Sequence, residues 1–162
     1  MPDTPDVADL QQPGAVELLH TPDPARLAYT GPDGYPRVVP VGFLWNGTAV
    51  VVCTAPTAPK VAALANQPHV ALTIDIMGPP AKQLLLRGIA SIEIVDGVAP
   101  EYLAAAAKST HGDELAAFEA EVRRVYKAMA RISIVPSWAR FHDFGAGRLP
   151  TFLRQLLEPG SA

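Results

Sequence analysis

The chain has 162 residues, of which 49% are hydrophobic and 18% are charged, a length and composition typical of one globular domain. A formal net charge of -3 argues against binding to the phosphate backbone of nucleic acids. No apolar run approaches the ~20 residues that a membrane-spanning helix needs, and the first residues are acidic where a secretory signal would be basic. The single cysteine, Cys53, excludes an internal disulfide and a cysteine-rich zinc site, and predicts a cytoplasmic protein.

The chain is expected to divide into a short leading segment and one domain. Residues 1–12 are rich in proline and aspartate and are predicted to be loose. Residues 13–162 are predicted to form a single domain. Its first element is a short helix over residues 13–20, where the apolar residues have helical spacing.

The next part of the chain predicts a three-stranded meander. Residues 26–30 and 35–45 have the composition of strands, and Gly31-Pro32-Asp33-Gly34 between them suits a tight turn. Asn46-Gly47 is a strong hairpin signal, because both residues tolerate positive φ. The β-branched residues 48–54 would then return as the third strand.

The remaining elements alternate less regularly. We predict helices over residues 60–66, 99–108, 113–130 and 151–158, and strands over residues 69–76, 83–95, 131–135 and 138–144. Six or seven strands with inserted helices predict a mainly β, α+β fold: an antiparallel split β-barrel with flanking helices. The glycine-rich phosphate loops of the common nucleotide folds are absent from the sequence.

The sequence contains no pattern typical of a catalytic or metal centre. The four histidines fall on different predicted elements and lack the spacing of metal ligands. The serines lie outside any Gly-x-Ser-x-Gly motif, and Cys53 within a valine-rich strand is more typical of a small buried hydrophobe than of a nucleophile. We therefore expect neither a catalytic side chain nor a bound metal.

The junction between the strand at 48–54 and the helix at 60–66 is a candidate anion site. Free backbone N–H groups and the positive end of the helix dipole attract anions there. Lys60 lies in the first helical turn, where a cation costs about 0.3–1 kcal/mol unless something negative is near. The turn alone leaves two interpretations open: an anion site, or a solvated lysine whose charge lies far from the helix axis.

A second candidate is the strand that contains Pro40 and Gly42. Proline gives up one hydrogen bond of a sheet, and glycine allows close approach to the backbone. Such a strand either lies at the edge of the sheet, with a bulge, or lines a ligand. Three aromatic residues suit either a planar ligand or the core: Trp45, Trp138 and Phe141.

Several short segments follow one another in a set order over residues 26–93 and 131–144. They are Leu27-Ala28-Tyr29-Thr30, Asp33-Gly34, Arg37-Val38-Val39-Pro40-Val41, Val50-Val51-Val52-Cys53-Thr54, Lys60-Val61, Pro68-His69-Val70-Ala71-Leu72, Gln83 to Ala90, and Arg131-Ile132-Ser133-Ile134 with Pro136. In this order they resemble the split β-barrel flavin-binding family typified by pyridoxamine 5'-phosphate oxidase, which includes flavin- and deazaflavin-dependent oxidoreductases. The resemblance implies a homodimer with its binding site at the subunit interface.

The resemblance also implies roles for particular residues. The strand with Pro40 would border the flavin ring, Thr54 and Lys60 would hold the cofactor phosphate, and Gln83 would contact the ring. Trp138 and Arg140 would come from the second subunit. The implied cofactor-binding residues are Arg37, Val39, Pro40, Val41, Thr54, Pro59, Lys60, Val61, Gln83, Trp138 and Arg140.

Pro59 departs from the family pattern, because many relatives have serine or arginine just before the lysine. Proline offers neither an N–H nor a charge, so the grip on phosphate is expected to be weaker. The cofactor that the resemblance implies is FMN, and the deazaflavin F420, which has a different tail, is the alternative. The resemblance implies an oxidoreductase that transfers hydride between this cofactor and a small organic substrate. The alternatives are a non-catalytic flavin or haem carrier or sensor, and an empty barrel that serves in dimerisation.

Overall fold

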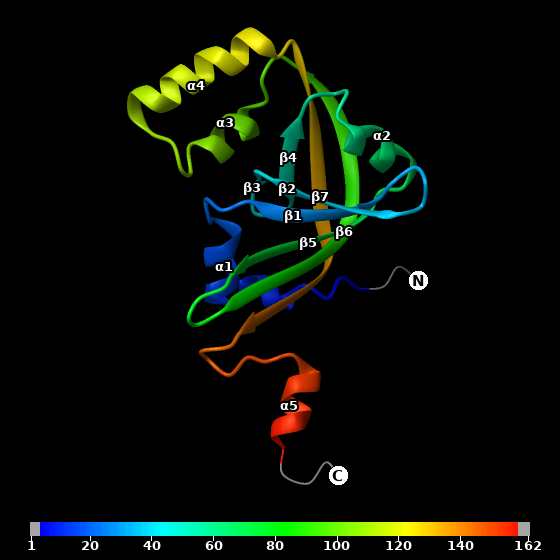
Figure 1. The fold of residues 1–162 in the computed structure, drawn as a ribbon, viewed down its shortest axis with the longest axis vertical. Helices are drawn as coiled ribbons and strands as arrows, with labels where there is room; N and C mark the ends of the chain where they lie inside the picture. The colour runs from blue at the N-terminus through cyan, green and yellow to red at the C-terminus, as the bar shows by residue number, and fades with distance from the viewer. Residues whose placement is uncertain (1–3, 159–162) are drawn as a thin grey trace.

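The computed structural model describes residues 4–158 (Figure 1). The strands are β1 (Ala25–Thr30), β2 (Pro36–Val41), β3 (Leu44–Trp45), β4 (Val50–Thr54), β5 (His69–Ile76), β6 (Lys82–Asp96) and β7 (Ala128–Asp143). The helices are the 3-10 helix η1 (Ala8–Gln11), α1 (Pro13–Leu19), α2 (Pro59–Asn66), α3 (Pro100–Ala106), α4 (Gly112–Val125) and α5 (Thr151–Leu157). A single sheet with inserted helices confirms the predicted fold class.

The sheet curls so that its two ends meet. Its seven strands run in the order β2-β1-β5-β6-β7-β4-β3, and all neighbours are antiparallel. The two edge strands, β2 and β3, follow each other in the chain and are joined only by Gly42 and Phe43. Since three residue steps span at most about 11 Å, the ends of the sheet lie close together. The Phe43 side chain is buried at this joint and is 1% exposed.

The main core fills the inside of the curled sheet. Alternate residues of β5, β6 and β7 face it, as the period of a strand requires. Leu18 and Leu19 of α1 close one end, and Gly14 lies so near the Phe141 ring that a Cβ there would meet it at 2.4 Å. This packing holds β6 and β7 in their bent course.

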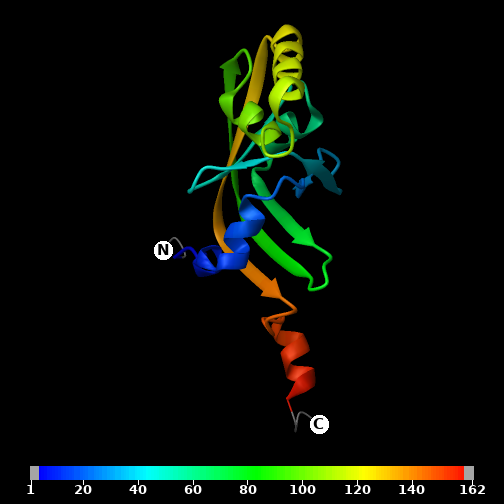
Figure 2. The ribbon, with the colours of Figure 1, turned by 90° about the vertical axis from the view of Figure 1, so that its left-hand side faces the viewer.

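A second, smaller core lies between the outer face of the sheet and the helices α3 and α4. Val98, Ala99, Val122 and Met129 form it, and aromatic side chains of both helices pack against them. The two helices therefore stand together at one end of the long β6–β7 ribbon (Figures 1 and 2).

The predicted meander is wrong beyond its first hairpin. β1 pairs with β2, and the Asn46-Gly47 turn joins β3 to β4, but β2 and β4 lie far apart in the sheet order. The predicted strand at 35–45 is broken at Gly42 and Phe43, because the chain crosses there from one end of the sheet to the other. Of the two interpretations left open for this strand, an edge position is observed for β2, and its pairing with β1 runs without a bulge.

The predicted helix at 113–130 ends early, at Val125, and its last residues belong to β7. Met129 and Ala130 are both fully buried, one against α3 and α4 and the other on the opposite face of the strand. A strand buried on both faces loses its alternating pattern and is easily mistaken for a helix. β7 also continues through Pro136, where a register shift beside Gly88 accommodates the proline, so the two predicted strands are one.

The described part of the leading segment is more ordered than the sequence predicts. Residues 1–3 lie outside the described residues, but Leu10 of η1 is buried in the core. Asp6 exchanges backbone hydrogen bonds with β7, donating to Ser137 (3.0 Å) and accepting from Ala139 (2.8 Å). At the other end, α5 projects away from the sheet (Figure 2). Within residues 4–158, every helix is too short or too polar to cross a membrane.

Candidate functional site

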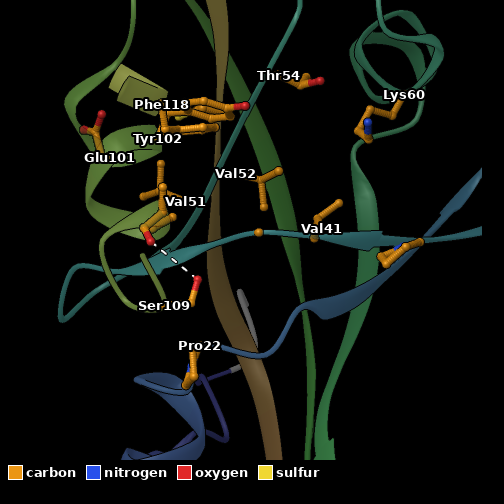
Figure 3. A pocket seen from close by; sticks show the side chains of 15 residues that line it. Pro22, Val41, Val51, Val52, Thr54, Lys60, Glu101, Tyr102, Ser109 and Phe118 are labelled. Carbon is orange, nitrogen blue, oxygen red and sulfur yellow. Dashed lines mark hydrogen bonds between the residues drawn. The ribbon is translucent and has the colours of Figure 1, made fainter. Parts of the chain in front are cut away.

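A cavity of about 380 Å³ lies where β2, β4 and the start of α2 face the helix α3 (Figure 3). We call it the Lys60 cavity. It is lined by Pro22, Pro40, Val41, Gly42, Val51, Val52, Cys53, Thr54, Lys60, Glu101, Tyr102, Ala105, Ala106, Ser109 and Phe118. Its volume lies in the range of small-molecule sites.

One side of the cavity is the joint between the two ends of the sheet. Pro40 and Val41 are the last residues of β2, opposite Arg26 and Ala25 of β1. Because β2 is an edge strand, its other flank has no neighbouring strand within the described residues. With Gly42 beyond it, this stretch offers a flat ligand a short ridge of apolar side chains and backbone.

The second side combines Thr54, at the end of β4, with Lys60, in the first turn of α2. Within residues 4–158 the Lys60 ammonium has no carboxylate partner. Pro59 lacks an N–H, and the N–H of Val61 is used by the carbonyl of Ala58 at 2.9 Å. The helix therefore offers few backbone donors to an anion. The side chains of Thr54 and Lys60 would supply most of the hydrogen bonds that hold it.

The third side, which we call the helical wall, comprises Glu101, Tyr102, Ala105, Ala106 and Ser109 with Phe118 of α4. The Tyr102 and Phe118 rings are stacked, with centroids 5.9 Å apart and planes at 22°. Burial, and to a lesser degree Tyr126, raises the pKa of Tyr102, so its hydroxyl stays protonated at neutral pH. In Figure 3 this wall stands opposite Lys60.

Two charged residues line the cavity, Lys60 and Glu101. The Glu101 carboxylate accepts a hydrogen bond from Arg131 at 3.1 Å, and the same guanidinium reaches Glu93 at 3.0 Å. Burial, and to a lesser extent the negative charge of Glu101, raises the pKa of the Cys53 thiol to about 11, which leaves it protonated and a poor nucleophile. The cavity is therefore equipped to bind and orient a ligand rather than to attack one.

The structure brings four of the implied cofactor-binding residues together in this cavity: Pro40, Val41, Thr54 and Lys60. Four other implied residues, which lie near these in the sequence, are not part of the cavity lining. Val39 and Val61 pack against the main core, and Pro59 borders a separate surface pocket of about 300 Å³. Arg37 bonds to Asp33 at 2.7 Å in the turn before β2.

The other three implied residues lie outside the lining of the Lys60 cavity, on β6 and β7. Gln83 is opposite His142 in the β6–β7 ladder. The Trp138 ring has two guanidinium groups against it, those of Arg87 at 4.2 Å and Arg140 at 4.9 Å. Arg140 also bonds to Asp6 at 2.5 Å and borders a separate cavity of about 530 Å³. The four clustered residues and these three do not form one site within a single chain.

The helical wall could not be assigned to the site from the sequence. Tyr102 and Phe118 are spaced like any core residues of amphipathic helices, and only their contact across the two helices places them at a cavity. A carboxylate in the first turn, such as Glu101, is typical of helix starts in general. The sequence therefore carries no signal that separates this wall from an ordinary packed helix pair.

The comparisons with known proteins agree with this architecture. An F420 reductase of known structure is 25% identical, with a TM-score of 0.60 over 76% of this chain and 94% of that one. The conserved hypothetical protein Rv2991 from Mycobacterium tuberculosis is 20% identical, with a TM-score of 0.66 over 90% and 93% of the two chains. HutZ, the haem storage protein of Vibrio cholerae, is 17% identical, with a TM-score of 0.57 over 82% and 93%.

A search of curated proteins finds no match. The family model for pyridoxamine 5'-phosphate oxidase, in contrast, matches residues 12–143, a span that contains the whole sheet and every residue lining the Lys60 cavity. This match confirms the resemblance found in the sequence: the chain belongs to the pyridoxamine 5'-phosphate oxidase family.

Proposed function

We propose that the chain is an oxidoreductase that binds FMN, or the deazaflavin F420, in the Lys60 cavity and reduces or oxidises a small organic substrate. One observation carries the proposal: the Lys60 ammonium, which lacks a carboxylate partner within the described residues, shares a cavity with the edge strand β2. The bound cofactor supplies the hydride chemistry. The protein's own residues hold the cofactor, orient it and exclude water.

The residues present fit the two ends of such a cofactor. A phosphate is suited to the Lys60 ammonium and the Thr54 hydroxyl, since charge-assisted hydrogen bonds are the strong ones. The flat ring is suited to the apolar ridge of Pro40 and Val41. The poor supply of backbone donors around Pro59 weakens the phosphate end, so that Lys60 carries much of the affinity.

The active species is a homodimer in this proposal, because two of the implied cofactor-binding residues are too far along β7 to line the cavity of their own chain. Trp138 and Arg140 lie outside the Lys60 cavity of their own chain, and we assign them to the cavity of the other subunit. An apolar surface suited to dimer contact lies close by on the same strands. Ile89 and Val135 are register partners on β6 and β7, and these residues are 55% and 53% exposed.

A haem carrier is the second candidate, supported by the structural similarity to HutZ. The lining of the Lys60 cavity argues against it, because none of the lining residues is a histidine, the commonest haem ligand. Cys53 is the other obvious ligand type, and its raised pKa disfavours the thiolate that would bind iron.

The test is to incubate the purified protein separately with FMN, F420 and haemin, remove free ligand by gel filtration, and record the absorption spectrum. We expect the protein to retain FMN or F420 at about one cofactor molecule per chain. Anaerobic mixing of the loaded protein with reduced nicotinamide, or with reduced F420, then tests for hydride transfer through the change in absorption. Binding of haemin alone would favour the carrier, and retention of none of the three would refute the proposal.

A further inference from the structure

The aromatic part of the helical wall is held in place by its own packing. The Tyr102 ring is stacked on Phe118 and lies 6.0 Å from the tilted ring of Tyr126. All three rings pack against the second core, which includes Val122 and the fully buried Met129. Side chains held in this way cannot move aside at low cost, so the shape of the wall restricts what can lie against it.

The wall also lacks positive charge. Ala105 and Ala106 occupy the positions that face the cavity one turn beyond Tyr102, and Glu101 is the wall's only charged residue. The nearest lysine in sequence, Lys108, has its ammonium over the Phe43 ring at 3.8 Å and is absent from the lining. Lys60 is on the opposite side of the cavity, as Figure 3 shows.

These two features favour one kind of ligand. A flat, uncharged ring gains contact with Tyr102 and Phe118, because aromatic rings also pack favourably edge to face. A ring that carries an anionic group finds no cation among the residues of the wall, since Arg131, which pairs with Glu101 at 3.1 Å, is outside the cavity lining, and a charge buried without a partner is costly. Lys60, the one lysine among the described lining residues, is assigned under the proposed function to the cofactor phosphate.

We propose that the helical wall selects the substrate: it accepts flat, uncharged ring compounds and rejects those that carry a sulfonate, phosphate or carboxylate. This inference rests on the proposed function, because it assumes that the cofactor occupies the Lys60 side. It names a substrate class that the family membership does not fix.

The test uses two ligands of nearly equal size that differ in charge, naphthalene-2-sulfonamide and naphthalene-2-sulfonate. Each is titrated into the cofactor-loaded protein, with isothermal calorimetry and the absorption of the bound cofactor as readouts. We expect the neutral sulfonamide to bind at least about tenfold more tightly, as one unpaired charge in a partly dry site predicts.

Two lysine variants of the same helix form a matched pair. Ala106→Lys places a cation in the wall and is expected to reduce the preference for the neutral ligand about tenfold. Ala104→Lys adds the same charge at an exposed position outside the cavity lining and should leave the preference unchanged. Melting temperatures of both variants check that the fold is kept.

The possible failures are distinguishable. A protein that retains neither FMN nor F420 would overturn the proposed function and this inference together. A loaded protein that binds the sulfonate as tightly as the sulfonamide, or binds neither, would overturn the selective wall alone. The selective wall would also be overturned if Ala104→Lys changed the preference as much as Ala106→Lys does.

Discussion

The ammonium of Lys108 lies 3.8 Å from the centroid of the Phe43 ring, and its nitrogen is buried without a hydrogen-bond partner among the described residues. Phe43 belongs to the joint between the two ends of the sheet, and Lys108 closely follows the last turn of α3. The contact is therefore a cation–π link between the helical wall and the joint. Burial lowers the pKa of Lys108 below its usual 10.5.

The lowered pKa of Lys108 predicts a pH-dependent stability. In the unfolded chain the lysine stays protonated up to about pH 10.5, whereas the folded chain releases the proton at lower pH. Between these two pKa values the unfolded state binds more protons, so the free energy of unfolding should rise with pH.

Urea titrations at a series of pH values up to about 10.5 measure the free energy of unfolding of the wild type and of Lys108→Met. The quantity of interest is the difference between the two proteins at each pH. The difference should shift in favour of the wild type as the pH rises. Lys127→Met, at an exposed position, is the control. A difference that stays constant with pH would show that the ammonium is solvated.

Lys60→Gln tests the phosphate end of the site. Hydrogen bonds to charged groups contribute about 1.5–3 kcal/mol each, so FMN affinity should fall about 10- to 100-fold. Fluorescence titration of FMN measures the dissociation constant. Lys127→Gln removes an exposed lysine outside the cavity and should bind FMN like the wild type. Equal affinities in the two variants would mean that Lys60 does not contact the phosphate.

Cys53 should be unreactive in the folded protein. With its pKa raised to about 11, the thiol has about a hundredth of the thiolate of an ordinary cysteine at neutral pH. Iodoacetamide should therefore modify the folded chain about a hundredfold more slowly than the urea-unfolded chain. Mass spectrometry gives both rates cleanly because the chain has a single cysteine. Similar rates in the two states would contradict the raised pKa.

Gly88 is required by the close approach of β6 and β7 at their register shift. A Cβ at this position would lie 2.5 Å from the backbone oxygen of Val135, which cannot move aside as a flexible side chain would. Gly88→Ala should lower the free energy of unfolding by about 1–3 kcal/mol. Gly42→Ala, where a Cβ meets nothing within 4 Å, is the matched control and should be tolerated. Equal stability of the two variants would refute the steric argument.

Val135→Lys tests the proposed dimer. A lysine within the exposed apolar pair of Ile89 and Val135 should weaken self-association and shift the sedimentation coefficient towards the monomer. FMN affinity should fall in parallel, since Trp138 and Arg140 of the second copy are then withdrawn. Val125→Lys, at an exposed valine of α4, should change neither property. A variant that stays dimeric would place the interface elsewhere.

Local signals in the sequence predict the elements that depend on local physics. The strand predicted over residues 69–76 is observed with the same bounds, as β5. The Asn46-Gly47 turn and the β1–β2 hairpin follow from residues that tolerate the required φ angles. The path of the chain after Val41 is not predictable in this way. It depends on Phe43 being buried between the ends of a curled sheet, which is a tertiary contact.

The site is predictable in part for a similar reason. Thr54 and Lys60 lie at a strand-to-helix junction, and Pro40 marks an edge strand, so local sequence points to both. Their meeting in one cavity, and the helical wall opposite them, depend on how the sheet curls and on how α3 packs across β4. The spacing of the lining residues along the sequence between residues 54 and 118 does not predict that they meet in one cavity.

The two-residue link at Gly42 and Phe43 connects the two edge strands through the covalent chain, while no hydrogen-bonded pairing between β2 and β3 is found among the described residues. Lengthening or shortening that link would reshape one side of the Lys60 cavity, because Gly42 is part of its lining. A change of length in this link would therefore alter ligand binding and stability together, because Gly42 lines the cavity and the adjacent Phe43 is buried in the main core.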